Sequence, residues 1–402
     1  MADVILKRGR EKSLLRRHPW IFSGSIHHVD GEHASGSTAD LLSSDGKFLA
    51  RASYSPTSQI RARVWTFEDE PVDKDFFRHK IRSSLVTRQK ACPEFFEGEN
   101  AESQSNAYRL VYAESDGIPG LIVDKYNDVL VLQSLTAGSE YWKETFADLL
   151  LEETGLSTIY ERSDADVRKL EGLEPKLGLL RGDLSCFTFP ITENDLRFKV
   201  NLQSGHKTGF YLDQRKNRLR VRELAKDKDV LDCFCYTGGF TVNALAGKAK
   251  SVLSVDSSTD ALELCKENIV LNDLPLGKCN TRKGDVFQLL RKFRDENRSF
   301  NMIILDPPKF APTASHADKA TRAYKDINLL AFKLLRPGGI LITFSCSGGV
   351  DAGLFQKIVA GAALDARVEA RIIEHLSQGA DHPTALNFPE GAYLKGLVCM
   401  RK

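Results

Sequence analysis

A cysteine stands between two serines in the segment TFSCSGG, residues 343–349, where an apolar run gives way to glycines. A deprotonated cysteine is a strong nucleophile, so Cys346 could form a covalent bond to a substrate. Cysteine is also among the residue types that are most often buried, and a thiol that only packs at a strand end would give the same pattern. The neighbours of Cys346 in the fold therefore decide its interpretation.

An aspartate followed by two prolines ends another apolar run, in the segment MIILDPPKF. Proline fixes φ and has no N–H to donate, so Pro307 and Pro308 predict a rigid exit from a strand. Asp306 could hydrogen-bond the edge of a planar base, and Lys309 could stabilise a thiolate or hold a phosphate. Because Cys346 ends the next predicted parallel strand, we expect it beside Asp306 at one edge of a sheet.

These groups suit methylation at carbon 5 of a pyrimidine, an atom that is a poor nucleophile by itself. Addition of a thiolate to carbon 6 makes carbon 5 nucleophilic, so that it can take up a methyl group. Loss of the C5 proton and elimination of the thiol then release the product. The thiol needs cationic or dipolar neighbours that favour its ionised form. We therefore predict Cys346, Asp306 and Lys309 as catalytic residues.

A glycine-containing turn follows an earlier predicted strand in the segment VLDCFCYTGGFT. Gly238 and Gly239 let the backbone come close to a ligand. Asp256 ends the next predicted strand, where a carboxylate suits the two hydroxyl groups of a ribose. The dinucleotide fingerprint G-x-G-x-x-G is absent, and Phe234 and Tyr236 stand where a pyrophosphate would need bare backbone. A dehydrogenase is therefore disfavoured.

A ligand that has a ribose but no phosphates fits this turn, and S-adenosylmethionine (SAM) is such a ligand. Asp232 could lie near its sulfonium or amino group, and Asp285 or Val286 could meet the adenine at the end of a third strand. The alternative is a doubly wound fold in which acids merely stand at strand ends. The residues predicted around the cofactor in this part of the chain are Asp232, Tyr236, Gly238, Gly239, Asp256, Ser257, Asp285, Val286, Asp306 and Pro307.

Two basic clusters could contact a polyanion, although the net charge of the chain is only +2. One cluster lies within residues 1–17 and the other begins at Lys207. Solvated surface charge is the ordinary explanation of such runs, but two clusters in different parts of one chain also favour contact with RNA or DNA. The predicted RNA-binding residues are Lys7, Arg8, Arg10, Arg16, Arg17 and Lys207.

Three regions of the chain differ in pattern, and we predict three domains. Residues 1–70 contain short alternating runs and turn signals, which favour a small β-rich domain. Residues 71–190 mix helices and strands, with helices predicted over 74–91 and 139–155. Residues 191–402 alternate strands with helices, which predicts a parallel, doubly wound sheet and an α/β fold class.

Composition gives the setting of the 402-residue chain, which is 42% hydrophobic and 27% charged. It contains no apolar run of about 18 residues and no apolar stretch of the kind that begins a signal peptide, so we predict a cytoplasmic protein without a membrane contact. Eight irregularly spaced cysteines favour thiols over a disulfide framework. Cys233 and Cys235 have no second pair at zinc-finger spacing, so we predict no metal site.

Taken together, the chain resembles the ribosomal large-subunit cytosine-5 methyltransferases of bacteria and archaea that carry an N-terminal PUA domain. The resemblance implies a PUA domain, a central α+β domain and a C-terminal Rossmann-like methyltransferase domain. It also implies SAM and a cytosine of 23S rRNA as co-substrates, with Cys346 as the catalytic cysteine. Phe210, Asp213 and Arg215 fall in a segment that the family places near the cofactor. The most specific segments are HPWIFSGSI (18–26), ESDGIPGLIVDKY (114–126), TGFYLDQR (208–215), DCFCYTGGF (232–240), DPPKF (306–310) and FSCSGG (344–349).

The chain departs from related enzymes after Asp306. Many RNA cytosine-5 methylases have a second cysteine in this motif, where this chain has Pro308 and Lys309. That difference fits a subgroup with one catalytic cysteine and leaves open which group assists product release. Many amine methylases have an aromatic residue after the prolines, so Lys309 also makes an exocyclic amine a less favoured target.

Two other functions remain open from the sequence. A related enzyme could methylate N7 of guanine on the same scaffold without a thiol nucleophile. A non-catalytic RNA-binding factor of ribosome assembly could retain a degenerate Rossmann domain, although intact Asp232, Gly238, Asp256 and Asp306 argue against it. The sequence also leaves open whether the partner is free 23S rRNA or an assembling large subunit, and whether the protein forms a homodimer.

Overall fold

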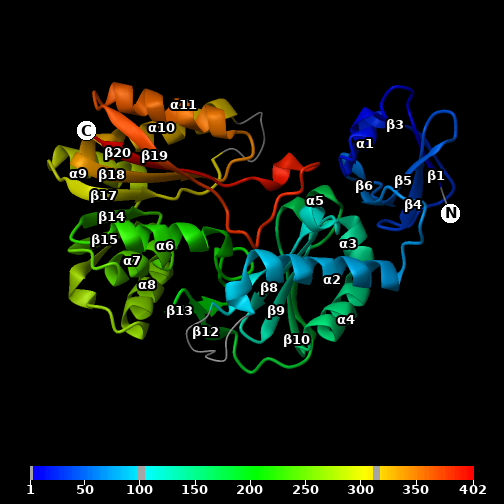
Figure 1. Ribbon diagram of the computed structural model, residues 1–402, viewed down its shortest axis with the longest axis horizontal. Coiled ribbons are helices and arrows are strands. Elements are labelled where there is room, and N and C mark those ends of the chain that lie inside the picture. The colour runs from blue at the N-terminus through cyan, green and yellow to red at the C-terminus, as the bar shows by residue number, and fades with distance from the viewer. Residues whose placement is uncertain (1–2, 97–104, 311–316) are drawn as a thin grey trace. The chain divides into compact units, whose positions relative to one another are not determined.

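The chain forms two compact units in a computed structural model that describes residues 3–96, 105–310 and 317–402 (Figure 1). The first unit contains Met1–Ile191, Val200–Leu212 and Ala380–Gly391, and the second contains Thr192–Lys199, Asp213–Gly379 and Ala392–Lys402. The chain therefore passes repeatedly from one unit to the other. The division into three domains with boundaries at residues 70 and 190 stays a prediction.

A six-stranded sheet with the order β2-β6-β5-β4-β1-β3 opens the first unit. Most of its neighbouring strands are antiparallel, and β1 pairs in parallel with β4. Alternate apolar residues, such as Val4 and Leu6 of β1, form its core. Its elements are β1 (Asp3–Leu6), α1 (Lys12–Leu15), β2 (Trp20–Phe22), β3 (Ile26–Asp30), β4 (Thr38–Leu42), β5 (Phe48–Tyr54) and β6 (Ile60–Thr66).

A five-stranded sheet with the order β11-β10-β9-β8-β7 follows in the same unit. The helix predicted over 74–91 is confirmed as α2 (Lys74–Ala91), and it begins where the side chain of Asp73 accepts a hydrogen bond from the N–H of Phe76 at 2.9 Å. Phe76, Phe77 and Ile81 of this helix pack on the sheet. The strands are β7 (Ala107–Tyr112), β8 (Leu121–Tyr126), β9 (Val129–Ser134), β10 (Thr158–Ser163) and β11 (Lys176–Arg181).

The single helix predicted over 139–155 is wrong, because two helices meet at Trp142. These are α3 (Ala137–Tyr141) and α4 (Lys143–Thr154). The backbone of Trp142 has ψ 4° and interrupts the helix, while its ring packs against the hydrophobic core of the unit. The predicted end is confirmed, since Gly155 closes α4 in the left-handed conformation with φ 69°.

The second unit is built on a seven-stranded sheet with the order β16-β15-β14-β17-β18-β20-β19. The strands from β14 to β18 pair in parallel, which confirms the α/β fold class. The sheet also contains β20, which is antiparallel to both of its neighbours. The strands are β14 (Asp229–Cys233), β15 (Ser251–Asp256), β16 (Cys279–Lys283), β17 (Phe300–Leu305), β18 (Leu335–Ser345), β19 (Ala370–Leu376) and β20 (Lys395–Arg401).

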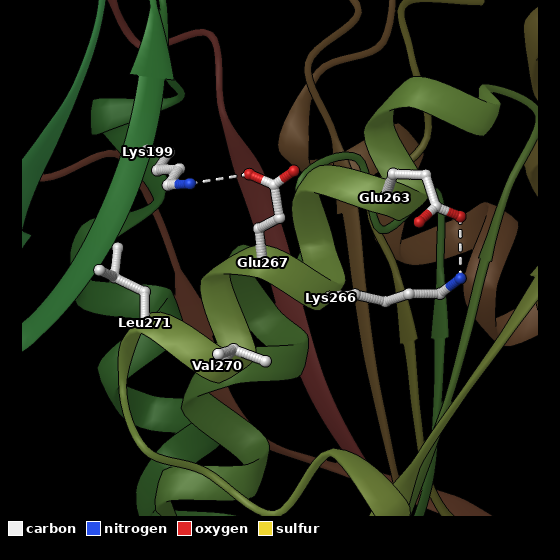
Figure 2. A pocket seen from close by; sticks show the side chains of 6 residues that line it. All are labelled: Lys199, Glu263, Lys266, Glu267, Val270 and Leu271. Carbon is white, nitrogen blue, oxygen red and sulfur yellow. Dashed lines mark hydrogen bonds and ion pairs between the residues drawn. The ribbon is translucent and has the colours of Figure 1, made fainter.

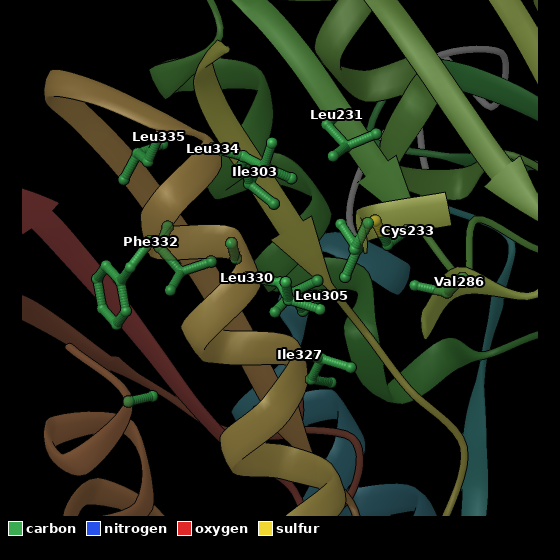
Figure 3. Packing of buried hydrophobic residues seen from close by; sticks show 14 of the residues in the cluster. Leu231, Cys233, Val286, Ile303, Leu305, Ile327, Leu330, Phe332, Leu334 and Leu335 are labelled. Atoms are coloured by element: carbon green, nitrogen blue, oxygen red, sulfur yellow. The ribbon is translucent and has the colours of Figure 1, made fainter. Parts of the chain in front are cut away.

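Helices cover both faces of this sheet (Figure 1). One layer contains α6 (Arg215–Leu224), α7 (Gly239–Ala246) and α8 (Thr259–Leu271), and the other contains α9 (Val286–Asp295), α10 (Ala317–Leu334) and α11 (Ala352–Asp365). Figure 3 shows the main core of the unit, where strand residues such as Leu231 and Ile303 meet Ile327 and Leu330 of α10. This packing fixes the positions of the strand ends that carry the candidate site.

Other features bear on the predicted setting of the protein. None of the helices in the described ranges combines the length and the hydrophobicity that crossing a membrane requires. All eight cysteines lie in those ranges, and none of them forms a disulfide. Among the same residues, no group of three or more His, Cys, Asp or Glu side chains is arranged to hold a metal ion.

Candidate active site

The strand order reverses between β14 and β17, near the middle of the seven-stranded sheet. In doubly wound sheets, ligands bind outside the carboxyl ends of the strands at such a point. Asp232 lies near the end of β14, Asp256 ends β15 and Asp306 directly follows β17. The structure therefore places these three carboxylates at one edge of the sheet.

Asp232 is fully buried, and one of its two carboxyl oxygens accepts a hydrogen bond. Its Oδ2 accepts a hydrogen bond from Oγ1 of Thr241 at 2.7 Å, whereas its Oδ1 has no hydrogen-bond partner among the described residues. Burial raises the pKa of Asp232 to about 7, and the negative charges of Asp306 and Asp256 act in the same direction. A cation beside Oδ1 would favour the ionised form of this carboxyl group.

Asp256 shapes the loop that follows β14. Its Oδ2 accepts a hydrogen bond from the backbone N–H of Tyr236, and its Oδ1 accepts one from the N–H of Ser258, both at 2.9 Å. Each carboxylate oxygen can accept a further hydrogen bond, so Asp256 can hold this loop and also bind hydroxyl groups. Ser257 is exposed beside it, and Thr237 in the loop has a buried Oγ1 without a hydrogen-bond partner in the described part of the chain.

Gly238 and Gly239 are needed for helix packing, a role that we did not foresee from the sequence. Gly238 has φ 81°, and a Cβ atom there would lie 2.3 Å from Sγ of Cys265 on α8. A Cβ atom at Gly239 would lie 2.9 Å from Cδ of Arg218 on α6. The missing side chains therefore let the start of α7 approach its two neighbouring helices, and the approach of a ligand to the same backbone stays a prediction.

Asp285 and Val286 have clear structural roles at the start of α9. The side chain of Asp285 caps the helix by accepting a hydrogen bond from the N–H of Gln288 at 2.9 Å. Val286 is buried in the core cluster of Figure 3. Neither role prevents the backbone here from meeting an adenine, and that contact stays a prediction.

Cys346 directly follows β18, and β18 pairs with β17. The Sγ of Cys346 donates a long hydrogen bond of 3.9 Å to the carbonyl oxygen of Pro307. Cys346 and Asp306 are half-buried, Pro307 is buried and Lys309 is exposed. The structure thus brings the thiol to the Asp-Pro segment that the sequence predicted as its neighbour.

Two side chains that we did not predict also belong to this edge. The hydroxyl group of Tyr324 on α10 lies 2.9 Å from Oγ of Ser347, and burial raises its pKa, with the charges of Cys346 and Asp306 acting in the same direction. Lys395 begins β20 and donates a hydrogen bond to the carbonyl oxygen of Ser347 at 2.8 Å. The local sequence gave no signal for Lys395, because its position depends on the antiparallel insertion of β20 beside β18.

The segment TGFYLDQR is divided between the two units. Phe210 is buried in the first unit, where its backbone N–H donates a hydrogen bond to the hydroxyl group of Tyr126 at 3.1 Å. Asp213 and Arg215 are buried in the second unit, and Oδ2 of Asp213 accepts a hydrogen bond from the hydroxyl group of Tyr393. Contact of these three residues with the cofactor stays a prediction.

The predicted RNA-binding residues all belong to the first unit. Those before residue 18 are exposed, and the guanidinium group of Arg17 forms an ion pair with Glu68 at 3.0 Å. The ammonium group of Lys207 lies 4.4 Å from the centre of the Tyr211 ring. The remaining exposed residues of this set are Lys7, Arg8, Arg10 and Arg16.

A surface pocket of about 340 Å³ lies in the second unit between α8 and β13 (Leu196–Asn201). Two ion pairs neutralise its charged lining, Lys199 with Glu267 at 2.9 Å and Lys266 with Glu263 at 2.8 Å (Figure 2). None of the residues that line this pocket was predicted for the candidate active site. We therefore assign no part of the reaction to it.

Two regions of the chain match known protein families. Residues 4–67 match a PUA-like domain family, and residues 179–384 match a family of S-adenosylmethionine-dependent methyltransferases. Proteins from Yersinia pseudotuberculosis serotype O:1b (strain IP 31758) and Yersinia pestis bv. Antiqua (strain Angola), each named ribosomal RNA large subunit methyltransferase I, are 50% identical over 397 residues. Each match covers 98% of both chains.

Solved structures share the fold. A candidate SAM-dependent methyltransferase from Streptococcus mutans superposes with a TM-score of 0.84 at 20% identity, and the match covers 100% of both chains. A second structure, of a candidate methyltransferase complexed with SAH, gives a TM-score of 0.85 at 20% identity, again with full coverage of both chains.

The residues of the site fit the cofactor of the matched family. The buried Oδ1 of Asp232 and Oγ1 of Thr237 have unused hydrogen-bonding capacity within the described residues, as the polar and cationic amino acid end of SAM requires. The carboxylate of Asp256 can still accept hydrogen bonds from hydroxyl groups. With these features and with 50% identity over nearly its whole length, the chain belongs to the family of S-adenosylmethionine-dependent methyltransferases that includes the proteins named ribosomal RNA large subunit methyltransferase I.

Proposed function

We propose that this protein methylates carbon 5 of a cytosine in 23S rRNA, with Cys346 as the nucleophile. The observation that carries the proposal is the position of Cys346, whose Sγ is 3.9 Å from the carbonyl oxygen of Pro307 at the carboxyl edge of the sheet. The name of the curated relatives supports a ribosomal RNA substrate. A methyltransferase acting on a nitrogen atom would need no thiol there.

Asp232 and Asp256 are proposed to hold the two ends of the cofactor. When bound, SAM supplies an electrophilic methyl group. Asp232 would accept a hydrogen bond from its amino group through Oδ1, and Asp256 would accept hydrogen bonds from the ribose. Asp285 and Val286 would face the adenine. The backbone of the loop at Tyr236 is held for this purpose by its hydrogen bond to Asp256.

The reaction that we propose for Cys346 begins with a bond from Sγ to carbon 6 of the cytosine. The electron pair displaced from the double bond between carbons 5 and 6 makes carbon 5 nucleophilic. After carbon 5 has gained its methyl group, it loses its proton to water, and the electron pair of that C–H bond restores the double bond and expels Sγ as a thiolate. Asp306 would hydrogen-bond the polar edge of the ring and keep carbon 6 near the thiolate.

The proposed RNA contacts begin with the exposed basic residues of the PUA-like domain. Lys and Arg side chains neutralise phosphates and hold the RNA, and the target cytosine must leave its stack to reach Cys346. Free 23S rRNA and an assembling large subunit are both proposed substrates. The proposed place of the reaction is the cytoplasm. The proposed reaction uses residues of one chain and does not require a dimer. A homodimer stays a prediction.

The test of this function is methyl transfer to 23S rRNA that lacks the modification, followed by identification of the methylated nucleoside. Wild-type protein should produce 5-methylcytidine. Cys346→Ala should lower kcat by roughly 10³-fold or more, because the covalent step is lost. RNA containing 5-fluorocytidine at the target should remain covalently attached to Cys346, since fluorine cannot leave carbon 5 as a cation.

The matched control is Cys186→Ala, because Cys186 is an exposed thiol of the first unit. It should retain wild-type turnover and still form the adduct. Near-wild-type turnover of Cys346→Ala would overturn the covalent mechanism. Appearance of 7-methylguanosine would establish the guanine-N7 alternative, and binding of RNA without binding of SAM would establish a non-catalytic factor.

A further inference from the structure

Lys395 holds the chain on both sides of the candidate nucleophile. In the antiparallel pairing of β18 with β20, Lys395 lies opposite Ser345, the residue before Cys346. Its side chain then reaches the residue after Cys346, because its Nζ donates a hydrogen bond of 2.8 Å to the carbonyl oxygen of Ser347. Lys395 therefore lies next to the residues on both sides of Cys346.

The charges around Lys395 come from several elements of the second unit. Partial burial lowers the pKa of Lys395, and the ammonium group of Lys309 after β17 acts in the same direction. The negative charges of Cys346 and of Asp351, which precedes α11, oppose that effect. The hydroxyl group of Tyr324 on α10 also contacts Ser347, and the charge of Asp306 acts on Tyr324. Lys395, which is hydrogen-bonded to the residue after Cys346, is therefore close enough for a negative charge on Cys346 to raise the pKa of Lys395.

We propose that Lys395 is a positioning residue for Cys346, whose charge favours the thiolate and whose hydrogen bond fixes the following peptide. This inference rests on the proposed function, because a thiol that only packs would need neither effect. A fixed cation near a thiol increases the fraction of thiolate at neutral pH. The effect is larger in a partly buried place than in bulk water, because the dielectric constant is lower there.

Substitutions of Lys395 can separate its charge from its hydrogen bond. Lys395→Arg keeps both, Lys395→Gln keeps an N–H donor without the charge, and Lys395→Met removes both. The measurement is the rate at which iodoacetamide alkylates Cys346 in the free protein between pH 5 and 10, followed peptide by peptide with mass spectrometry. Alkylation of the exposed Cys186 in the same samples gives an internal reference.

We expect the midpoint of the Cys346 alkylation curve to rise by about one pH unit in Lys395→Gln and Lys395→Met, as is usual when an opposite charge nearby is lost. Alkylation at pH 7 should then slow by about tenfold, because less thiolate is present. Lys395→Arg should keep the wild-type midpoint, and Cys186 should react equally in all variants. The acidic limb of the kcat profile should move in parallel in the two uncharged variants.

Three outcomes would overturn the inference. A midpoint that stays at the wild-type value in Lys395→Gln would show that the charge is irrelevant to the thiol. A midpoint that shifts in Lys395→Met but not in Lys395→Gln would show that Lys395 acts only through its hydrogen bond. An increase in KM for RNA without a shifted midpoint would make Lys395 an RNA contact.

Two controls keep the result interpretable. Lys357→Met, on the exposed face of α11, should leave both the midpoint and the melting temperature unchanged. If Lys395→Met unfolds, Lys395→Gln and Lys395→Arg still decide between the outcomes. The alkylation curves use neither RNA nor SAM, so they do not depend on the proposed function. Retained methylation by Cys346→Ala would reject that function even where Lys395 tunes the thiol.

Discussion

The eight thiols of this chain are chemically similar residues in very different surroundings. Burial raises the pKa of Cys233 and Cys235 well above the ordinary value and that of Cys399 to about 12, so these thiols stay neutral and pack. Cys346 is half-buried at the carboxyl edge of the sheet, where its Sγ is 3.9 Å from the carbonyl oxygen of Pro307 and Lys395 is hydrogen-bonded to the next residue, Ser347. Position in the fold, which the order of the motifs indicated, therefore distinguishes Cys346 from these three buried cysteines.

At the same scale, Asp232 should couple cofactor binding to pH. Its pKa of about 7 in the folded protein means that the ionised form that pairs with a cationic amino group becomes dominant only above neutrality. SAM affinity should therefore rise between pH 6 and 8. Asp232→Asn should bind SAM about 10- to 100-fold more weakly at pH 8, with little dependence on pH, because a charge-assisted hydrogen bond is lost. Titration calorimetry at three pH values measures both effects.

The same substitution should change how stability depends on pH. The pKa of Asp232 rises from 3.8 to about 7 on folding, so the folded chain binds the proton more tightly than the unfolded chain. The proton on Asp232 therefore stabilises the folded chain at low pH, and this part of the free energy of unfolding is lost as pH rises from about 4 to 7. In Asp232→Asn the free energy of unfolding should not show this decrease. Asp260→Asn, an exposed aspartate of α8, should behave like wild type in both measurements. Unchanged SAM binding by Asp232→Asn would contradict the proposed cofactor contact.

At the scale of elements, the predicted parallel strands were visible because each is an apolar run that ends in a polar residue. Asp232, Asp256 and Asp306 could be placed at one edge for that reason. The positions of β19 and β20 could not be predicted, because β20 lies between β18 and β19 and the pairing partners of a strand depend on tertiary structure, not on the strand's own pattern. Lys395 was not predicted as a site residue because β20 was not predicted. The break at Trp142 was not predicted because the residues before and after it both favour a helix.

The start of α7 tests how tightly these elements pack. Gly238→Ala should lower the free energy of unfolding by about 2–4 kcal/mol, from left-handed backbone strain and from a Cβ atom 2.3 Å from Sγ of Cys265. Gly277→Ala is the matched control, because the added Cβ would have no atom within 4 Å beyond its own residue and its two chain neighbours. Urea denaturation of both variants measures the difference. Equal stability of the two variants would mean that α7 and α8 can separate without cost.

At the scale of the whole chain, each unit is assembled from segments that are far apart in the sequence. Residues 200–212 and 380–391 return to the first unit after the chain has entered the second. The sequence showed a change of pattern near residue 190 but carried no signal for these returns. Buried polar groups hold the returning segments: Oδ2 of Asp124 accepts a hydrogen bond from Thr208 at 2.5 Å, and Tyr112 donates one to the carbonyl oxygen of Gly391 at 2.8 Å.

Arg88 on α2 is a sensitive point of this assembly, because its fully buried guanidinium group binds three separate segments. It donates hydrogen bonds to the carbonyl oxygen of Arg109 at 3.0 Å, to Oδ1 of Asp116 at 2.7 Å and to the carbonyl oxygen of Asp381 at 3.1 Å. Arg88→Met should cost about 3–5 kcal/mol of unfolding free energy, because a buried carboxylate and two carbonyl groups lose their donor. Faster hydrogen exchange should appear in residues 380–391.

Arg82→Met on the same helix is the matched control for this prediction. Arg82 is 57% exposed, and its ion pair with Glu153 at 2.6 Å should contribute only about 0–1 kcal/mol. Urea denaturation should therefore separate the two variants clearly, and hydrogen exchange of residues 380–391 should be normal in Arg82→Met. If both variants lost the same stability, the buried network would not hold the returning segment. The attachment of residues 380–391 would then have to come from their other contacts, such as the hydrogen bond from Tyr112 to Gly391 and the packing of Phe388.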